Sequence, residues 1–221
     1  CASGGGRFDP GILYYAPQGW TSDDTDAAER VKIQYGTSMC YPVSSMGSHV
    51  SVVPNHQLNR KTPLHTRANV AYFGTFGYEL DLNKLTDEEI AEVKAQIIFM
   101  KEYRELIQFG TFYRLKSPFE GNETAWMTVS EDKKTALVFW YRERNVVNAD
   151  FTRVRLQGLD PDLIYRNEYN ETENYGDELM NLGLLTTDCT AGEPTSEDAP
   201  CTDYESRIYV LTTVARIPSP L

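Results

Sequence analysis

The chain has 221 residues, enough for one or two globular domains, and its 41% hydrophobic and 24% charged residues are an ordinary balance for a protein with a packed core. A formal net charge of −11 argues against binding nucleic acid through its phosphates, because that function needs a basic face. No apolar run approaches the roughly 20 residues that a membrane-spanning helix needs, so we expect neither a nucleic acid nor a membrane as partner.

The first half of the chain alternates short apolar segments with helical patterns. Apolar segments at residues 12–15, 38–43 and 70–76 predict strands, and a helix is expected over residues 26–35. Asp26 lies three positions before Glu29 and directly ahead of the helical pattern, which favours a helix cap. This alternation predicts βα units whose parallel strands are buried on both faces.

The longest predicted helix follows Thr86. Thr86 and Glu89 have the spacing of a capping box, and Gly110 is well placed to end the helix. Apolar residues recur between these limits at three- or four-residue steps, at Ile90, Val93, Ile97, Met100 and Ile107. We therefore place a domain boundary at Gly110, with domains at residues 1–110 and 111–221.

The second half of the chain has the pattern of an antiparallel β-sandwich. Residues 124–129 and 135–141 predict a hairpin around the polar turn at residues 130–133, and further strands are expected at residues 153–156, 163–166 and 207–213. Trp126 and Trp140 either belong to the core, the commoner place for aromatic residues along strands, or mark a sugar-binding face. Residues 188–202 are poor in apolar residues and predict a surface loop.

The acidic segment Trp20-Thr21-Ser22-Asp23-Asp24-Thr25-Asp26 is the strongest candidate for chemistry. A carboxyl group beside a large aromatic ring can act as a general acid, and the ring offers an apolar face to a sugar. The alternative is a set of helix caps and solvated turn residues. The segment lacks the glycine and closing Glu of an EF-hand, and the glycines at positions 4–6 are not followed by the Gly-Lys-Ser/Thr of a P-loop.

Metal and cofactor chemistry has no clear sequence signal. His49, His56 and His65 are irregularly spaced and no cysteine pair joins them at ligand spacing, so we expect no zinc site and no cofactor. The three histidines are expected in loops or in packing contacts, with the first two possible at the mouth of a site.

Several segments together resemble the carboxyl-terminal third of an α-galactosidase of glycoside hydrolase family 36. The segments are CASGGGRFDPG, QGWTSDDTDAAER, KIQYGTSMCYP, GSHVSVVPNH and NVAYFGTFGYELDL, and then KEYRELIQFGTFYRL, SPFEGNETAW and YGDELMNLGL. The resemblance implies an α/β fold followed by an all-β fold, namely the carboxyl-terminal part of a (β/α)₈ TIM barrel and an antiparallel β-sandwich domain. It also implies a retaining enzyme that cleaves terminal α-galactosides of the raffinose or melibiose type.

The resemblance also assigns residues. It implies that Asp23 is the proton donor and acid/base, and that Cys1, Ala2, Ser3 and Gly4 line the galactose pocket. Trp20 and Asp24 are expected to bound the pocket or bind a sugar hydroxyl, with a core residue and a solvated loop carboxylate as the alternatives. The family's nucleophile lies on an earlier strand with a Lys-x-Asp pattern that these residues lack, so this chain is expected to supply one of the two catalytic carboxylates.

Part of a barrel would expose sheet edges and apolar surface. We therefore expect these residues to fold within a longer polypeptide or against a partner copy, in a homo-oligomer that the resemblance makes a tetramer. The competing hypothesis is a non-catalytic sugar-binding or assembly module. Cys189 and Cys201 could close a disulfide and so indicate secretion, whereas related bacterial enzymes act in the cytoplasm, which we favour slightly.

Overall fold

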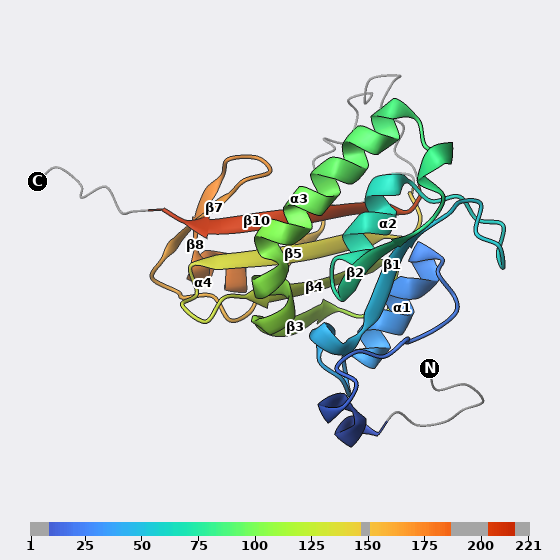
Figure 1. The fold of residues 1–221 in the computed structure, drawn as a ribbon. Coiled ribbons are helices and arrows are strands. Elements are labelled where there is room, and N and C mark those ends of the chain that lie inside the picture. Colours follow the sequence, from blue (N-terminus) through green and yellow to red (C-terminus); the bar gives the residue numbers. More distant parts are fainter. Residues whose placement is uncertain (1–8, 147–150, 187–202, 215–221) are drawn as a thin grey trace, which may run out of the picture. The chain divides into compact units, whose positions relative to one another are not determined.

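The computed structural model describes residues 9–146, 151–186 and 203–214 (Figure 1). The chain divides between Phe109 and Gly110 into two compact units, each with its own helices and strands. Within the described residues no helix is both long and apolar enough to cross a membrane.

The first unit is built on parallel pairing. β1 and β2 run side by side in the same direction, with Gly47 opposite Thr75 and Ser51 opposite Glu79, and α2 packs against β1 and α1. Gly74 must be a glycine, because a Cβ there would lie 2.8 Å from the carbonyl oxygen of Met46. The elements of this unit are η1 Pro10–Tyr14, α1 Ala27–Thr37, η2 Val43–Ser45, β1 Gly47–Ser51, α2 Leu64–Ala71, β2 Thr75–Glu79, η3 Leu82–Lys84 and α3 Asp87–Phe109.

Helix prediction in this unit is confirmed. Asp26 is the N-cap of α1, where its side chain accepts hydrogen bonds from the backbone N–H groups of Ala28 and Glu29. The capping box of α3 is present in both directions, since the Thr86 N–H donates to Glu89 Oε2 at 2.9 Å and the Glu89 N–H donates to Thr86 Oγ1 at 3.3 Å.

Strand prediction in this unit is wrong at three places. Residues 12–15 fall in and just after the exposed 3₁₀ helix η1, which Asp9 caps and Pro10 starts. Residues 38–42 form the turn after α1, Val43 begins η2, and the strand starts only at Gly47. Residues 70–71 belong to α2, and β2 starts at Thr75. Short apolar runs fit a buried helix as well as a buried strand, so the pattern placed strands before or inside the true elements.

The second unit is antiparallel, as predicted. Its main sheet has six strands in the order β3-β4-β5-β10-β7-β8, and β6 pairs with β9 in a separate two-stranded sheet. The predicted hairpin is β4 and β5, in register from Glu123 opposite Arg142 to Val129 opposite Ala136. The elements are β3 Thr111–Lys116, β4 Glu123–Val129, β5 Thr135–Arg142, β6 Arg153–Val154, β7 Ile164–Asn167, β8 Glu173–Tyr175, α4 Gly176–Asn181, β9 Leu184–Leu185 and β10 Glu205–Thr213.

The apolar core of this unit lies between the main sheet and the layer that contains β6, α4 and β9. Trp140 and Val138 of the sheet pack in one cluster with Val154, Leu179 and Leu184 of that layer. Trp140 belongs to this cluster, whereas Trp126 stacks on Phe139 on the other face of the sheet; both rings are fully buried and offer no exposed sugar-binding face. The predicted surface loop at 188–202, with Cys189 and Cys201, lies outside the described residues.

Candidate active site

The acidic segment begins where a parallel segment of the first unit ends. Gly19 forms a parallel bridge with Met46, and the Gly47 N–H donates to the Gly19 carbonyl at 2.9 Å. The residues around Gly19 therefore continue the parallel order of β1 and β2 on the other side of β1. Trp20 to Asp26 follow at the carboxyl end, the edge at which parallel α/β folds bind their ligands.

Asp23 is an exposed carboxylate with one fixed partner. The indole Nε1 of Trp20 donates a hydrogen bond to Asp23 Oδ1 at 2.9 Å. An indole N–H can only donate, so Oδ1 is held as an acceptor. Oδ2 accepts no hydrogen bond from any residue that the structure describes, so only one oxygen of this exposed carboxylate is occupied.

The Trp20 ring is held in turn by β1. Its centroid lies 4.6 Å from that of the His49 imidazole, at an interplanar angle of 38°. A Cβ on Gly47 would lie 3.4 Å from the Trp20 ring and 3.2 Å from the Gly19 carbonyl oxygen, so glycine permits this close approach. Burial lowers the pKa of His49, an effect that Glu79 opposes and Arg30 reinforces, and the neutral imidazole is thereby favoured beside the indole.

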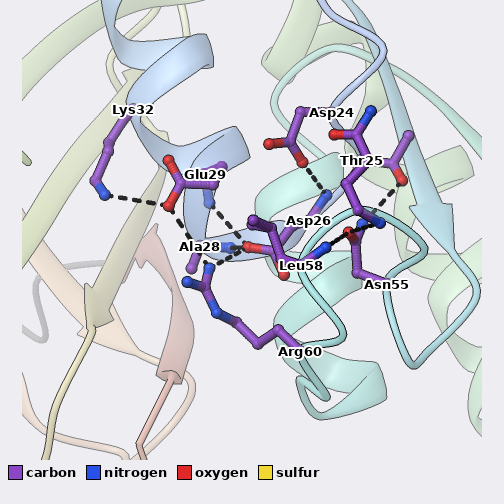
Figure 2. A network of polar contacts seen from close by, with 10 residues as sticks. Asp24, Thr25, Asp26, Ala28, Glu29, Lys32, Asn55, Leu58 and Arg60 are labelled. Atoms are coloured by element: carbon purple, nitrogen blue, oxygen red, sulfur yellow. Dashed lines mark hydrogen bonds and ion pairs between the residues drawn. The ribbon is translucent and has the colours of Figure 1, made fainter.

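The remaining acidic residues build the turn that leads into α1 (Figure 2). The Asp24 N–H donates to Ser22 Oγ at 3.1 Å, and the Asp26 N–H donates to Asp24 Oδ1 at 3.0 Å. Asp26, almost fully buried, then caps the helix and pairs with Arg60. One oxygen of Asp24 therefore holds the backbone, and the local chain around Asp23 is ordered by hydrogen bonds.

A buried arginine lies beneath this turn. Arg30 donates to Thr21 Oγ1 at 2.7 Å and to the Gly47 carbonyl at 2.6 Å, so it joins the acidic segment to β1. Burial lowers the pKa of the Arg30 guanidinium to about 10, and the carboxylate of Asp24 opposes this effect. Arg30 therefore keeps its charge at neutral pH.

The structure brings some predicted residues together and leaves others aside. Trp20, Asp23 and Asp24 lie in one turn, whereas Cys1, Ala2, Ser3 and Gly4 lie outside the described residues. His49 supports Trp20, whereas His56 and His65 are exposed. Within the described ranges no group of His, Cys, Asp and Glu side chains could hold a metal ion.

Sequence reasoning missed the basic residues of this region. Arg30 and Gln34 are four residues apart on the buried face of α1. Polar side chains on an otherwise apolar helix face indicate buried polar contacts, so the sequence contained a signal for these two residues. Arg60 gave no such signal, since its partner lies 34 residues earlier in the chain.

Comparison with known proteins gives the same family over both units. Residues 1–110 match the family described as "Melibiase", and residues 123–211 match the "Glycosyl hydrolase family 36 C-terminal domain". The α-galactosidase AgaA of Geobacillus stearothermophilus is 57% identical over 184 residues, which are 83% of this chain and 25% of that protein. An α-galactosidase of Hypocrea jecorina is 44% identical over 185 residues, again 83% of this chain and 25% of that protein.

Solved structures agree. An α-galactosidase from Lactobacillus brevis superimposes with a TM-score of 0.89 at 48% identity, over 100% of this chain and 29% of that one. A variant of AgaA in complex with raffinose superimposes with a TM-score of 0.87 at 50% identity, over 96% of this chain and 28% of that one. The chain thus spans about a quarter of the length of the curated relatives that it matches.

Proposed function

Because the chain belongs to glycoside hydrolase family 36, we propose that the complete protein hydrolyses terminal α-galactosides and that Asp23 is its acid/base. The observation that carries this proposal is the exposed Asp23 carboxylate, fixed through one oxygen by Trp20 at the carboxyl end of a parallel segment. A relative of known structure binds raffinose, a terminal α-galactoside. The first unit is, in this proposal, the carboxyl-terminal part of a (β/α)₈ barrel, and the second is its β-sandwich domain.

The mechanism needs two carboxylates. An aspartate outside these 221 residues attacks the anomeric carbon, while Asp23 donates its proton to the oxygen of the leaving group. Asp23 then takes a proton from a water molecule, which hydrolyses the covalent intermediate and releases galactose with its configuration retained. Trp20 holds the carboxyl group and bounds the pocket, and Asp24 and residues 1–4 complete the galactose side.

The test is an Asp23→Asn variant of the complete protein. Loss of proton donation should lower kcat/KM for raffinose by about 10²- to 10⁴-fold, and should affect aryl galactosides with acidic leaving groups much less. Asp162→Asn is the matched control, because it neutralises an exposed carboxylate of the second unit that has no proposed role in the site. Cleavage of raffinose at the parent rate by Asp23→Asn would refute the assignment.

Azide gives an independent readout. In an Asp23→Ala variant, azide needs no general base and should accelerate turnover of an activated aryl galactoside. The product should be α-galactosyl azide, because attack on the covalent intermediate restores the starting configuration. A β-configured azide product would contradict a retaining mechanism.

The assembly is part of the same proposal. Several large apolar side chains of the first unit are exposed, among them Tyr14, Tyr15 and Ile98. Such surface is typical of interfaces, which supports a homo-oligomer, and the family resemblance makes it a tetramer. Light scattering of the complete protein tests this, and a monomer at micromolar concentration would refute it.

The alternative of a non-catalytic sugar-binding module is weaker. It depended on an exposed aromatic face in the second unit, and the two tryptophans that suggested one are core residues. Galactose binding without turnover by the complete protein would nevertheless favour the module over the enzyme.

A further inference from the structure

A second segment lies beside the acidic turn, at residues 52–60 between β1 and α2. It starts directly after Ser51, the last residue of β1, and therefore at the same carboxyl edge as Asp23. Since the parallel segment before Trp20 is the neighbour of β1, the chain that leaves β1 is the neighbour of the acidic turn.

Two side chains fasten segment 52–60 to the start of α1 (Figure 2). Arg60 forms an ion pair with Asp26 and approaches Glu29 Oε1 at 3.6 Å. Asn55 Nδ2 donates to Thr25 Oγ1 at 3.4 Å. Both partners lie within three residues of Asp23, so the segment is attached to the turn that carries the acid/base.

Asn55 also orders segment 52–60 from within. Its side-chain oxygen accepts the backbone N–H groups of Gln57 and Leu58, at 2.9 and 3.0 Å, and its own N–H donates to the Arg60 carbonyl at 2.9 Å. Asn55 itself is buried, whereas the side chains of His56, Gln57 and Leu58 are exposed. An ordered backbone thus presents three exposed side chains beside the acidic turn.

An acid that protonates a leaving group must lie on the leaving-group side of the scissile bond. From this, and resting on the proposed function, we infer that segment 52–60 forms the leaving-group side of the site. Its exposed residues 56–58 determine selectivity for the sugar units of the leaving group. Arg60 is a positioning residue, which acts by holding the segment on Asp26.

Arg60 attaches segment 52–60 to α1 through its ion pair with the buried carboxylate of Asp26. Asp26 is 3% exposed, and its Oδ1 is buried with no hydrogen-bond partner among the described residues. Arg60→Met alone would leave a buried carboxylate without its cation and could unfold the region. The double variant Asp26→Asn/Arg60→Met removes the charge as well and keeps a good N-cap, so it separates attachment from folding.

Raffinose and melibiose make a suitable pair of substrates for the complete protein. They share the galactose, the scissile bond and the leaving oxygen on glucose, and raffinose adds a fructose. The ratio of their kcat/KM values therefore reports the shape of the leaving group and is insensitive to its acidity. A defect in the acid/base lowers both values together, as does general loss of folded protein.

We expect the ratio of kcat/KM for raffinose to that for melibiose to change by about fivefold or more in Asp26→Asn/Arg60→Met. The same change is expected in Leu58→Ser, which alters only an exposed side chain and leaves the attachment of the segment intact. Two control variants should keep the parent ratio. Lys32→Met removes the cation that contacts Glu29 in the same network, and Leu182→Ser changes another exposed leucine, in the second unit.

An unchanged ratio in both test variants, at a parental melting temperature, would overturn the inference and leave the proposed function intact. If the parent protein cleaves neither sugar, the proposed function fails first, and the inference fails with it.

Discussion

The two units stabilise their strands in different ways. In the first unit, β1 pairs with β2, and Gly19 bridges to Met46 just before β1. Two buried guanidinium groups donate to the carbonyls at the ends of β1. Arg30 donates to the Gly47 carbonyl, and Arg67 donates to the Ser51 carbonyl at 2.5 Å. In the second unit, the main sheet packs on an apolar cluster centred on β4 and β5. Polar groups thus fix the ends of β1 in the first unit, whereas apolar packing holds the main sheet of the second unit.

The largest expected effect is on the apolar cluster. Trp140→Ala removes a fully buried ring whose Nε1 has no hydrogen-bond partner within the described residues, and should lower the free energy of unfolding by about 3–5 kcal/mol. Trp140→Phe, which loses less volume and no hydrogen bond, should cost much less. Urea denaturation measures both, and hydrogen exchange should rise first in β4, β5 and β10. Equal losses in the two variants would contradict a packing role.

The next effect is on the polar clamp of β1. Arg30→Met removes the donor to Thr21 Oγ1 and leaves the Gly47 carbonyl with only the long hydrogen bond from the Thr21 hydroxyl, at 3.4 Å, so it should lower the free energy of unfolding by about 1–3 kcal/mol. Hydrogen exchange should rise in the acidic turn and β1, and stay at the parent level in the second unit. Lys32→Met, on the same helix but in an exposed pair, should change stability by less than about 0.5 kcal/mol. If Arg30→Met and Lys32→Met lowered the free energy of unfolding by similar amounts, the buried polar contacts of Arg30 would not be what stabilises β1.

A smaller effect is expected at the start of α3. Thr86→Ala removes the hydroxyl that accepts the Glu89 N–H, and should cost about 1 kcal/mol in thermal or urea unfolding. Thr86→Ser keeps that hydroxyl and should remain close to the parent. If Thr86→Ala left the free energy of unfolding unchanged, the capping box would be present without stabilising the helix.

The smallest effect is a pH dependence that arises in the first unit. Burial lowers the pKa of His49 in the folded protein, so the unfolded chain binds more protons below about pH 6.5. The stability that depends on neutral His49 is therefore present above that pH and is lost as the pH falls. Replacing His49 with Phe should make the melting temperature less sensitive to pH between about 5 and 7. The same pH sensitivity in parent and variant would contradict this account.

Helices and the hairpin could be predicted from the sequence because their signals are local. Asp26, the Thr86–Glu89 box and the turn at 130–133 act over a few residues, and the structure confirms all three. Strands of the first unit could not, since a parallel strand buried on both faces has no alternation that distinguishes it from a buried helix. The prediction consequently placed one strand at residues 38–43, before β1, and another at residues 70–76, which overlaps β2 only at Thr75 and Phe76.

The sequence by itself determined the family, the candidate acid/base Asp23 and the elements with local caps and turns. Only the tertiary structure decided what holds that carboxylate in place. Trp20 meets His49, Arg30 meets Gly47, and Asp26 meets Arg60 across 34 residues. Such contacts depend on how parallel segments are ordered side by side, and no local pattern of residues encodes that order.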